Sequence, residues 1–275
     1  MKAECKICPH HCKIEEGHVG LCRARTNRQG NVICGNYGKL TAMALDAIEK
    51  KPLRHFHPGS SILSVGSYGC NMKCPFCQNC DISMVSEHET QTVGISCEEL
   101  AEKALELKNR GNIGIAYTYN EPLISYEFVR DCAETAKSKG LKNVAVTNGY
   151  ICEEPLKELL PLIDAFNIDL KGFTEKYYHK LRGDLETVKR TIELASQSCH
   201  VEITTLVVPG ENDSDEEMEA LSGWLSSVDR QIPLHISRFF PRWQMQDRSA
   251  TPVSKIYHLA ELARKNLKYV YEGNC

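Results

Sequence analysis

Short apolar runs alternate with longer amphipathic segments from residue 61 onward, and this rhythm restricts the fold more than any other feature. Six runs are short and rich in β-branched residues, as strands are, and each precedes a segment with helical spacing. Repeated strand–helix units of this kind form a parallel sheet covered by helices. The sequence therefore predicts an α/β fold with strands at 61–65, 113–118, 143–147, 165–170, 200–208 and 232–237, a further strand at 268–271, and helices at 97–109, 126–138, 153–162, 185–198, 215–228 and 253–267.

Polar groups stand at the ends of five of the six main strands. The carboxyl ends of parallel strands meet at one edge of a sheet and carry the chemistry of such folds, so these side chains are expected to converge. Metal-ligating, acidic, basic and amide groups are all present. They are Cys70, Asn120, Glu121, Asn148, Asp169, Lys171, His235 and Arg238.

The charge balance argues against two broad classes of partner. The chain has 275 residues and a net charge of −3, with an isoelectric point of about 6.4. No general affinity for nucleic acid or for an anionic membrane is therefore expected. The first residues are polar, and no apolar run is long enough to span a bilayer. The cytoplasm is the expected compartment.

Cysteine is the unusual residue type, with 14 copies. Disulfides are not expected in a reducing cytoplasm, and scattered cysteines pack as small hydrophobes. Cysteines at gaps of two or three residues are instead typical of metal ligands. Two groups have such gaps, one near the N-terminus (Cys5, Cys8, Cys12 and Cys22) and one after the first strand (Cys70, Cys74, Cys77 and Cys80).

The second group contains a C-x3-C-x2-C motif formed by Cys70, Cys74 and Cys77. Three thiolates from one loop can hold three irons of a 4Fe–4S cubane and leave the fourth iron without a protein ligand. Two alternatives use Cys80 as a fourth ligand: a closed electron-transfer cluster and a zinc knuckle. A closed cluster has no use for the polar groups at the other strand ends, so the open cluster is favoured.

The motif has Phe76 at its aromatic position and resembles the C-x3-C-x-aromatic-C hallmark of the radical S-adenosylmethionine (SAM) superfamily. The resemblance implies a partial (β/α)6 TIM-like barrel over residues 61–275. It also implies that SAM chelates the open iron and is cleaved reductively to methionine and a 5′-deoxyadenosyl radical, which abstracts hydrogen from a substrate. A reductase such as flavodoxin or ferredoxin is implied as electron donor.

The same resemblance implies which residues bind SAM. The stretch 119–122 resembles the family's Gly-Gly-Glu-Pro motif, in which Glu121 accepts a hydrogen bond from the SAM amino group. The stretches 146–149 and 169–171 resemble Asp-Thr-Asn-Gly and Asp-Leu-Lys of pyruvate formate-lyase-activating enzymes. The implied SAM-binding residues are Phe76, Asn120, Glu121, Asn148, Asp169, Lys171 and His235, and Arg238 is the candidate for binding a substrate carboxylate or SAM.

Several of these residues also have an ordinary structural interpretation. Glu121 has the position of a helix-start carboxylate, and Asn148 belongs to an Asn-Gly pair that is typical of turns. Asp169 and Lys171 alternate onto one face of a strand and can form a surface ion pair. These alternatives remain open from the sequence alone.

Three blocks narrow the resemblance to the AmmeMemoRadiSam-system radical SAM enzymes, a branch close to the pyruvate formate-lyase activators. The blocks are residues 5–25, residues 49–60 and Cys77-Gln78-Asn79. The branch implies Memo-like and AMMECR-like partner proteins and a peptide or protein substrate. Val146 and Thr204 stand where the activators have aspartate and arginine, which weakens the inference of a glycyl-radical substrate. A small-molecule substrate stays open, as does a non-catalytic electron-transfer or metal-binding module.

Residues 1–60 show little periodicity and are interpreted as a cysteine-rich N-terminal lobe, a separate domain before the barrel domain of residues 61–275. Cys5, Cys8, Cys12 and Cys22 fit a tetrahedral structural zinc site. Such a site would order a segment that has little core of its own. An auxiliary iron–sulfur cluster and free thiols are the alternatives.

Overall fold

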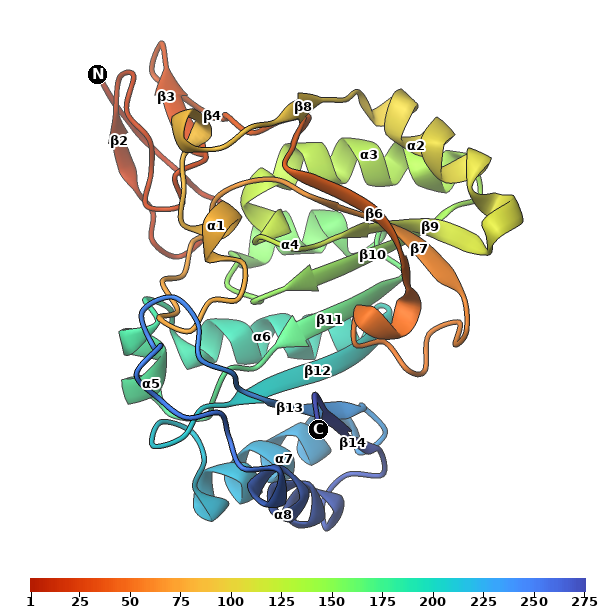
Figure 1. Cartoon of the computed structure of the whole chain (residues 1–275). Helices are drawn as coiled ribbons and strands as arrows, with labels where there is room; N and C mark the ends of the chain where they lie inside the picture. The colour runs from red at the N-terminus through yellow and green to blue at the C-terminus, as the bar shows by residue number, and fades with distance from the viewer.

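The computed structural model describes residues 1–275 and centres on one eight-stranded sheet (Figure 1). The strand order is β14-β13-β12-β11-β10-β9-β7-β6. All neighbours are parallel except the antiparallel pair β6 and β7. The strands are β6 Ala42–Ala47, β7 Ser61–Gly66, β9 Asn112–Tyr117, β10 Lys142–Thr147, β11 Ala165–Asp169, β12 His200–Val207, β13 Leu234–Arg238 and β14 Val270–Gly273. The edge strands β6 and β14 do not pair with each other, so the barrel is incomplete.

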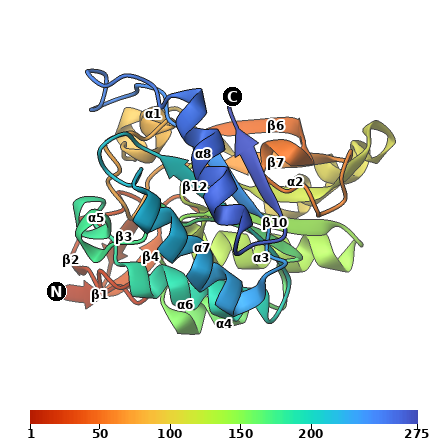
Figure 2. The same cartoon turned by 90° about the horizontal axis from the view of Figure 1, so that it is seen from below.

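The helices α2, α3, α4, α6, α7 and α8 pack along the outer face of the sheet (Figures 1 and 2). Capping side chains start several helices: Ser96 accepts from Glu99 N before α2, and Asp184 accepts from Thr187 N before α6. The helices are α1 Cys80–Ser83, α2 Cys97–Glu106, α3 Tyr126–Ser138, α4 Glu153–Leu159, α5 Glu175–Lys180, α6 Leu185–Ser196, α7 Asp215–Asp229 and α8 Val253–Arg264. None of them is both long and apolar enough to cross a membrane.

The α/β fold and the partial barrel predicted from the sequence are confirmed. The six main strands appear as β7 and β9–β13, with ends that differ from the expected ones by at most two residues, and β14 lies near the expected extra strand. The structure adds β6, which comes from a segment without clear strand periodicity. Because β6 pairs with β7, the last part of the expected lobe belongs to the main sheet.

The N-terminal lobe is built from very short antiparallel pairs: β1 Lys2–Glu4 with β2 Lys13–Glu15, β3 Arg25–Arg28 with β4 Asn31–Cys34, and β5 Lys39–Leu40 with β8 Val93–Gly94. The guanidinium of Arg25 fixes the lobe to the barrel. It donates to both carboxylate oxygens of Glu127 in α3, at 2.7 and 2.6 Å, and to the carbonyl of Ile124 at 3.1 Å. This bidentate pair is largely buried, with the Arg25 side chain 5% exposed.

Side chains inside the barrel form layers, because every second residue of a strand points to the same face. In β12, Glu202 lies near the amino end and Leu206 near the carboxyl end, and their side chains share the inner face. In β13, His235 and Ser237 are related in the same way. Of these four, Leu206 and Ser237 reach the cavity described next, whereas Glu202 and His235 do not.

Candidate active site

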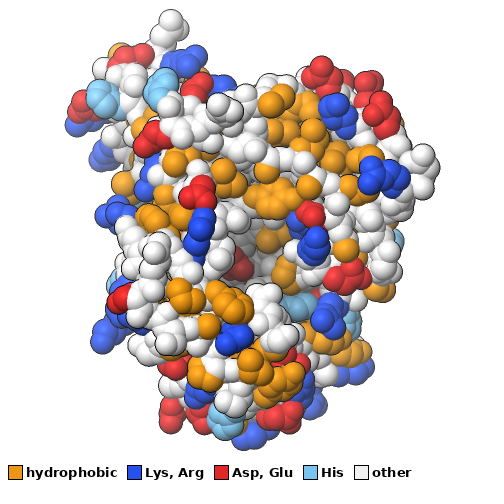
Figure 3. Space-filling view, viewed as in Figure 1, with side chains coloured by type: hydrophobic (Ala, Val, Ile, Leu, Met, Phe, Trp, Pro, Cys, Tyr) orange, Lys and Arg blue, Asp and Glu red, His pale blue; other side chains and the backbone are white.

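A cavity of about 310 Å³ lies at the carboxyl ends of the parallel strands and is lined by 22 residues. The space-filling view shows this face of the molecule hollowed near its middle (Figure 3). The volume is at the lower end of the range for small-molecule sites. Nine of the expected site residues line it: Cys70, Cys74, Cys77, Phe76, Asn120, Glu121, Asn148, Asp169 and Lys171.

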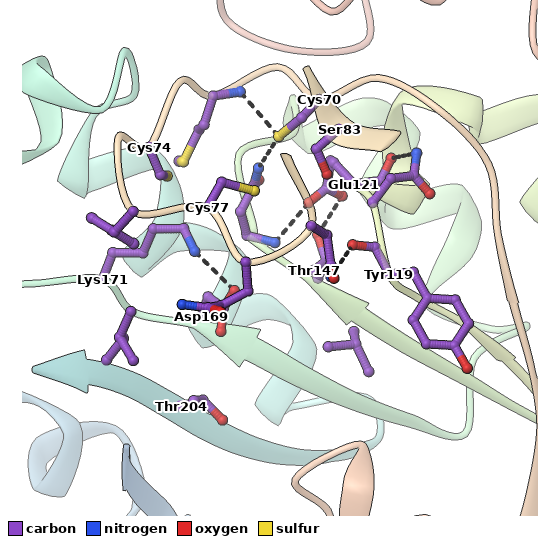
Figure 4. A pocket seen from close by; sticks show the side chains of 18 of the residues that line it. Cys70, Cys74, Cys77, Ser83, Tyr119, Glu121, Thr147, Asp169, Lys171 and Thr204 are labelled. Atoms are coloured by element: carbon purple, nitrogen blue, oxygen red, sulfur yellow. Dashed lines mark hydrogen bonds and ion pairs between the residues drawn. The ribbon is translucent and has the colours of Figure 1, made fainter. Parts of the chain in front are cut away.

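The loop after β7 brings the thiols of Cys70, Cys74 and Cys77 to one side of the cavity (Figure 4). All three are free. Burial raises the pKa of Cys70 well above that of an ordinary thiol and that of Cys74 to about 11. A metal is therefore needed to hold these groups as thiolates at neutral pH. No three Cys, His, Asp or Glu side chains lie at single-ion distances, and a cubane does not require this because its thiolates bind different irons.

Backbone hydrogen bonds fix the cluster loop, defined as residues 69–79, from two distant segments. Lys73 N donates to Leu181 O at 2.8 Å, and Gln244 N donates to Pro75 O at 3.0 Å. Cys80, the alternative fourth ligand, starts α1 instead and is not among the residues that line the cavity. The loop therefore presents three thiols to the cavity and not four.

Glu121 is a buried carboxylate at the start of the loop that follows β9. It accepts hydrogen bonds from Thr147 Oγ1 at 2.6 Å, Asn148 N at 2.7 Å and Leu123 N at 3.0 Å. Burial raises the pKa of Glu121 to about 7, against the opposing effect of these bonds and of the charge on Lys171. A cationic ligand in the cavity would stabilise its charged form.

Asn120 lines the cavity, but its side chain binds the protein. Its Nδ2 donates to Tyr68 O at 3.2 Å and to Gly69 O at 3.0 Å, while its Oδ1 accepts from Ser67 N at 2.9 Å. Asn120 therefore holds the chain just before Cys70 in place. A glycine at this position, as in the family's motif, could not do so.

Asn148 reaches the cluster loop. Its Nδ2 donates to Asn71 Oδ1 at 2.9 Å and lies 3.7 Å from Cys70 Sγ, and its Oδ1 accepts from Tyr150 N at 2.9 Å. Hydrogen bonds to cysteine sulfurs are among the features that set cluster potentials. The Asn148 side chain is thus in contact with the first cysteine of the cluster loop, and it also lines the cavity.

Asp169 and Lys171 lie on the same side of the end of β11, as the alternation predicts. Lys171 Nζ donates to Asp169 Oδ2 at 2.9 Å, and Lys171 N donates to Tyr178 Oη at 3.1 Å. Burial alone would lower the pKa of Lys171, but the Asp169 carboxylate and Cys74 raise it well above its usual value. This pair lies in the cavity wall, where the Lys171 side chain is 14% exposed and that of Asp169 35%.

His235 and Arg238 do not reach the cavity, so the structure does not place them where the resemblance implies. His235 Nε2 lies 2.6 Å from a carboxylate oxygen of the buried Glu202, one layer deeper than Ser237. Arg238 Nε donates to Thr251 O at 2.6 Å, and its guanidinium lies over the ring of Phe240. Neither side chain is therefore kept in the proposed site.

Several cavity residues are absent from the set expected from the sequence. Thr147, Ser83, Thr204 and Ser237 line the cavity (Figure 4 labels the first three). The alternation of β13 could have indicated Ser237, because it follows His235 by two residues and lies nearer the strand's carboxyl end. The position of Ser83 depends on how the cluster loop turns into α1, which no local pattern specifies.

Comparison with known proteins decides the family. The model of the radical SAM superfamily matches residues 64–221, which include the three-cysteine motif and strands β9–β12. The chain belongs to the radical SAM superfamily. It is 40% identical to an uncharacterized protein of Methanocaldococcus jannaschii over 276 residues, which cover 99% of this chain and 81% of that protein.

Two further comparisons place this radical SAM protein beside characterised members. It is 29% identical to the pyruvate formate-lyase 1-activating enzyme of Escherichia coli over 162 residues, which are 56% of this chain and 63% of that enzyme. The match thus spans less than two thirds of the enzyme. The crystal structure of Streptococcus suis SuiB bound to S-adenosylmethionine shares the fold, with a TM-score of 0.55 and 14% identity over 78% of this chain and 49% of that one.

The residues present fit the cofactors of the family, a 4Fe–4S cluster and SAM. Three free thiols face one cavity, and the polar wall opposite them includes a buried carboxylate with a pKa near 7. Cys70, Cys74 and Cys77 would hold the cluster, and Glu121 would accept from the SAM amino group. Zinc finds no comparable support at the cavity, because Cys80 does not join the other three thiols.

Proposed function

We propose that this radical SAM protein abstracts hydrogen from a peptide or protein substrate, using a 4Fe–4S cluster on Cys70, Cys74 and Cys77 that supplies the electron for splitting SAM into methionine and a 5′-deoxyadenosyl radical. The observation that carries the proposal is the cavity in which three free thiols face Glu121. An electron-transfer module would need neither the cavity nor the carboxylate.

The protein's own residues bind and orient SAM and exclude water from the cavity. Glu121 binds the SAM amino group, and Thr147 with the Asn148 backbone keeps its carboxylate oriented. Lys171, held by Asp169, places a positive charge beside Cys74 and compensates part of the negative charge of the thiolates. Phe76, which is 4% exposed, lies between Cys74 and Cys77 and contributes an apolar side chain to the cavity wall.

Two features favour a large substrate. The barrel is open between β6 and β14, so the cavity is not enclosed on all sides. The activating enzyme of Escherichia coli is named for its action on another protein, pyruvate formate-lyase 1. A reductase such as flavodoxin or ferredoxin would supply the electron. Memo-like and AMMECR-like proteins are the partners to test first as substrate or carrier.

The test is formation of 5′-deoxyadenosine by protein reconstituted with iron and sulfide in the absence of oxygen. Dithionite and SAM are added, and the product is measured by mass spectrometry. Wild type is expected to form product only with reductant, and Cys74→Ala to form none. Cys80→Ala is the matched control, since this buried cysteine lies outside the cavity, and it should keep both iron content and product.

Two results would overturn the proposed reaction. Either Cys80→Ala abolishes product as fully as Cys74→Ala does, or the loaded wild-type protein binds no SAM. The substrate class needs a second assay. Deuterium should move into 5′-deoxyadenosine from a labelled protein partner, and movement from a labelled small metabolite instead would transfer the proposal to small-molecule substrates.

A further inference from the structure

Four cysteines of the N-terminal lobe surround a second, small cavity. Cys5, Cys8, Cys12 and Cys22 line it together with Ile7, Ile14 and Ile124. Cys5, Cys8 and Cys22 are 6%, 8% and 7% exposed, and all four thiols are free. Cys5, Cys8 and Cys12 come from the connection between β1 and β2, and the folding of the lobe brings Cys22, which precedes β3, to the same cavity. None of them takes part in the site described above.

A backbone amide is directed at one of these sulfurs. Arg25 N donates to Cys22 Sγ at 3.5 Å. The cluster loop repeats the pattern, because Met72 N lies 3.4 Å from Cys70 Sγ. A thiol sulfur is a weak acceptor, whereas the thiolates of metal sites are stabilised by such bonds.

The lobe has little internal structure of its own beyond its contacts with the barrel. Its strands β1–β5 have two to four residues each and form only two-stranded pairs. Isolated pairs of this kind are marginally stable in water. Small units without a sizeable core need a staple such as a metal, and no disulfide supplies one here.

We propose that Cys5, Cys8, Cys12 and Cys22 hold a second thiolate-bound metal centre, either zinc or an iron–sulfur cluster. No three of these thiols lie at the distances of a single-ion site, so the loops that carry them close around the metal when it binds. The four sulfurs suit both metals, since four cysteines can ligate either a zinc ion or an iron–sulfur cluster. The proposal does not depend on the reaction at the cluster loop.

The second centre is in direct contact with the cluster loop. A Cβ at Gly69, the residue before Cys70, would lie 2.3 Å from the carbonyl oxygen of Cys22. His10, two residues after Cys8, has its Nε2 2.7 Å from Asn71 O. Metal in the lobe therefore fixes one side of the loop that presents the catalytic thiols.

The test separates the two centres by mutation. A variant with Cys70, Cys74 and Cys77 all changed to Ala is supplied with zinc, or with iron and sulfide, and its metal content is measured. It should retain about one zinc ion or about one iron–sulfur cluster per chain. Adding Cys5→Ala and Cys22→Ala should remove that metal. Adding Cys34→Ala should not, because this lobe cysteine interacts with Asn36 and lies outside the quartet.

The outcomes distinguish the metals and leave the proposal open to refutation. Zinc retained without iron, or iron with equal sulfide, identifies the occupant. Absence of both, or equal metal with and without Cys5 and Cys22, would overturn the proposal. If the five-cysteine variant does not fold, cobalt(II) is titrated into the three-cysteine variant. Thiolate-to-cobalt absorption saturating at one equivalent supports the site, and no such absorption refutes it.

Two glycines test the contact between the centres. Gly69 has φ of +88° and Gly59 has φ of +81°, so alanine at either position takes up an unfavourable left-handed conformation. Only Gly69→Ala also meets the Cys22 carbonyl; nothing lies within 4 Å at Gly59. Gly69→Ala is expected to lower metal content at both centres and Gly59→Ala at neither. Unchanged content in Gly69→Ala would refute the coupling.

Discussion

The two ends of the barrel each contain a buried glutamate, and the two carboxyl groups differ sharply. Glu121 at the carboxyl ends of the strands is 4% exposed, and its pKa is raised to about 7. Glu202 at the amino ends is fully buried, and its pKa is lowered to about 2. Burial raises the pKa of both groups, so their hydrogen-bond donors and charged neighbours make the difference.

Glu202 has four donors within 3.0 Å. His200 Nε2 and His235 Nε2 lie 2.9 and 2.6 Å from its oxygens, and the backbone amides of Arg54 and His55 donate at 3.0 and 2.7 Å. Glu121 has three donors, none of them a histidine. At the amino ends of the strands, the protein itself thus stabilises the negative charge of Glu202. At the carboxyl ends, a cationic ligand would further stabilise the negative charge of Glu121.

The largest expected effect on stability comes from removing the Glu202 carboxylate. Glu202→Ala leaves two histidines and two amides without their acceptor, and the loss of stability should be about 3 to 5 kcal/mol. Denaturant unfolding measures it. Glu49→Ala is the control, because Glu49 accepts only an exposed loop amide, that of Gly59, and should cost less than about 1 kcal/mol. Equal losses in the two variants would contradict the comparison.

Acid should remove the same stabilisation gradually. The folded-state pKa of Glu202 is depressed from 4.5 to about 2, so its contribution is complete above pH 4.5 and is lost as the pH falls toward 2. The loss should total about 3 kcal/mol. The difference in unfolding free energy between wild type and Glu202→Gln should therefore shrink over this window. A difference that is constant with pH would show that Glu202 is not preferentially ionised in the fold.

The sequence predicted the positions of the strands better than it predicted how deep in the barrel each side chain lies. Strand positions followed from apolar runs, and the convergence of Cys70, Glu121 and Lys171 followed from parallel strand ends. His235 was assigned to the cavity, but alternation specifies which way a residue points and not how deep it lies, and Ser237 occupies the upper layer.

Glu202 was missed for a related reason. A charged residue within the apolar run 200–208 was a signal of an unusual interior position. Its partners could not be read from the sequence, because two amides come from the loop at 54–55, about 150 residues away. Only the closed arrangement of β12, β13 and that loop brings them together.

The next prediction concerns Glu121 and its effect on the binding of SAM. Glu121→Gln removes a charge-assisted hydrogen bond worth about 1.5 to 3 kcal/mol, so SAM should bind roughly 10- to 100-fold more weakly to the cluster-loaded protein. In wild type the affinity should rise with pH through the pKa near 7, because deprotonation creates the charged acceptor for the N–H of the SAM amino group. Calorimetric titration at pH 6, 7 and 8 measures both effects. Glu202→Gln should keep the pH dependence, and its persistence in Glu121→Gln would refute the role of Glu121.

The smallest expected effect tests whether the donors set the difference between the two glutamates. Thr147→Val removes the donor that lies 2.6 Å from Glu121 and keeps the shape of the side chain. One lost hydrogen bond of about 1 kcal/mol should raise the pKa of Glu121 by about 0.7. The midpoint of the SAM affinity profile should move to higher pH by that amount. Thr205→Val removes a hydroxyl that donates to Leu170 O, away from Glu121, and should leave the midpoint unchanged. A midpoint that stays fixed in Thr147→Val would mean that burial alone sets the charge of Glu121, and the contrast with Glu202 would then rest on its histidines.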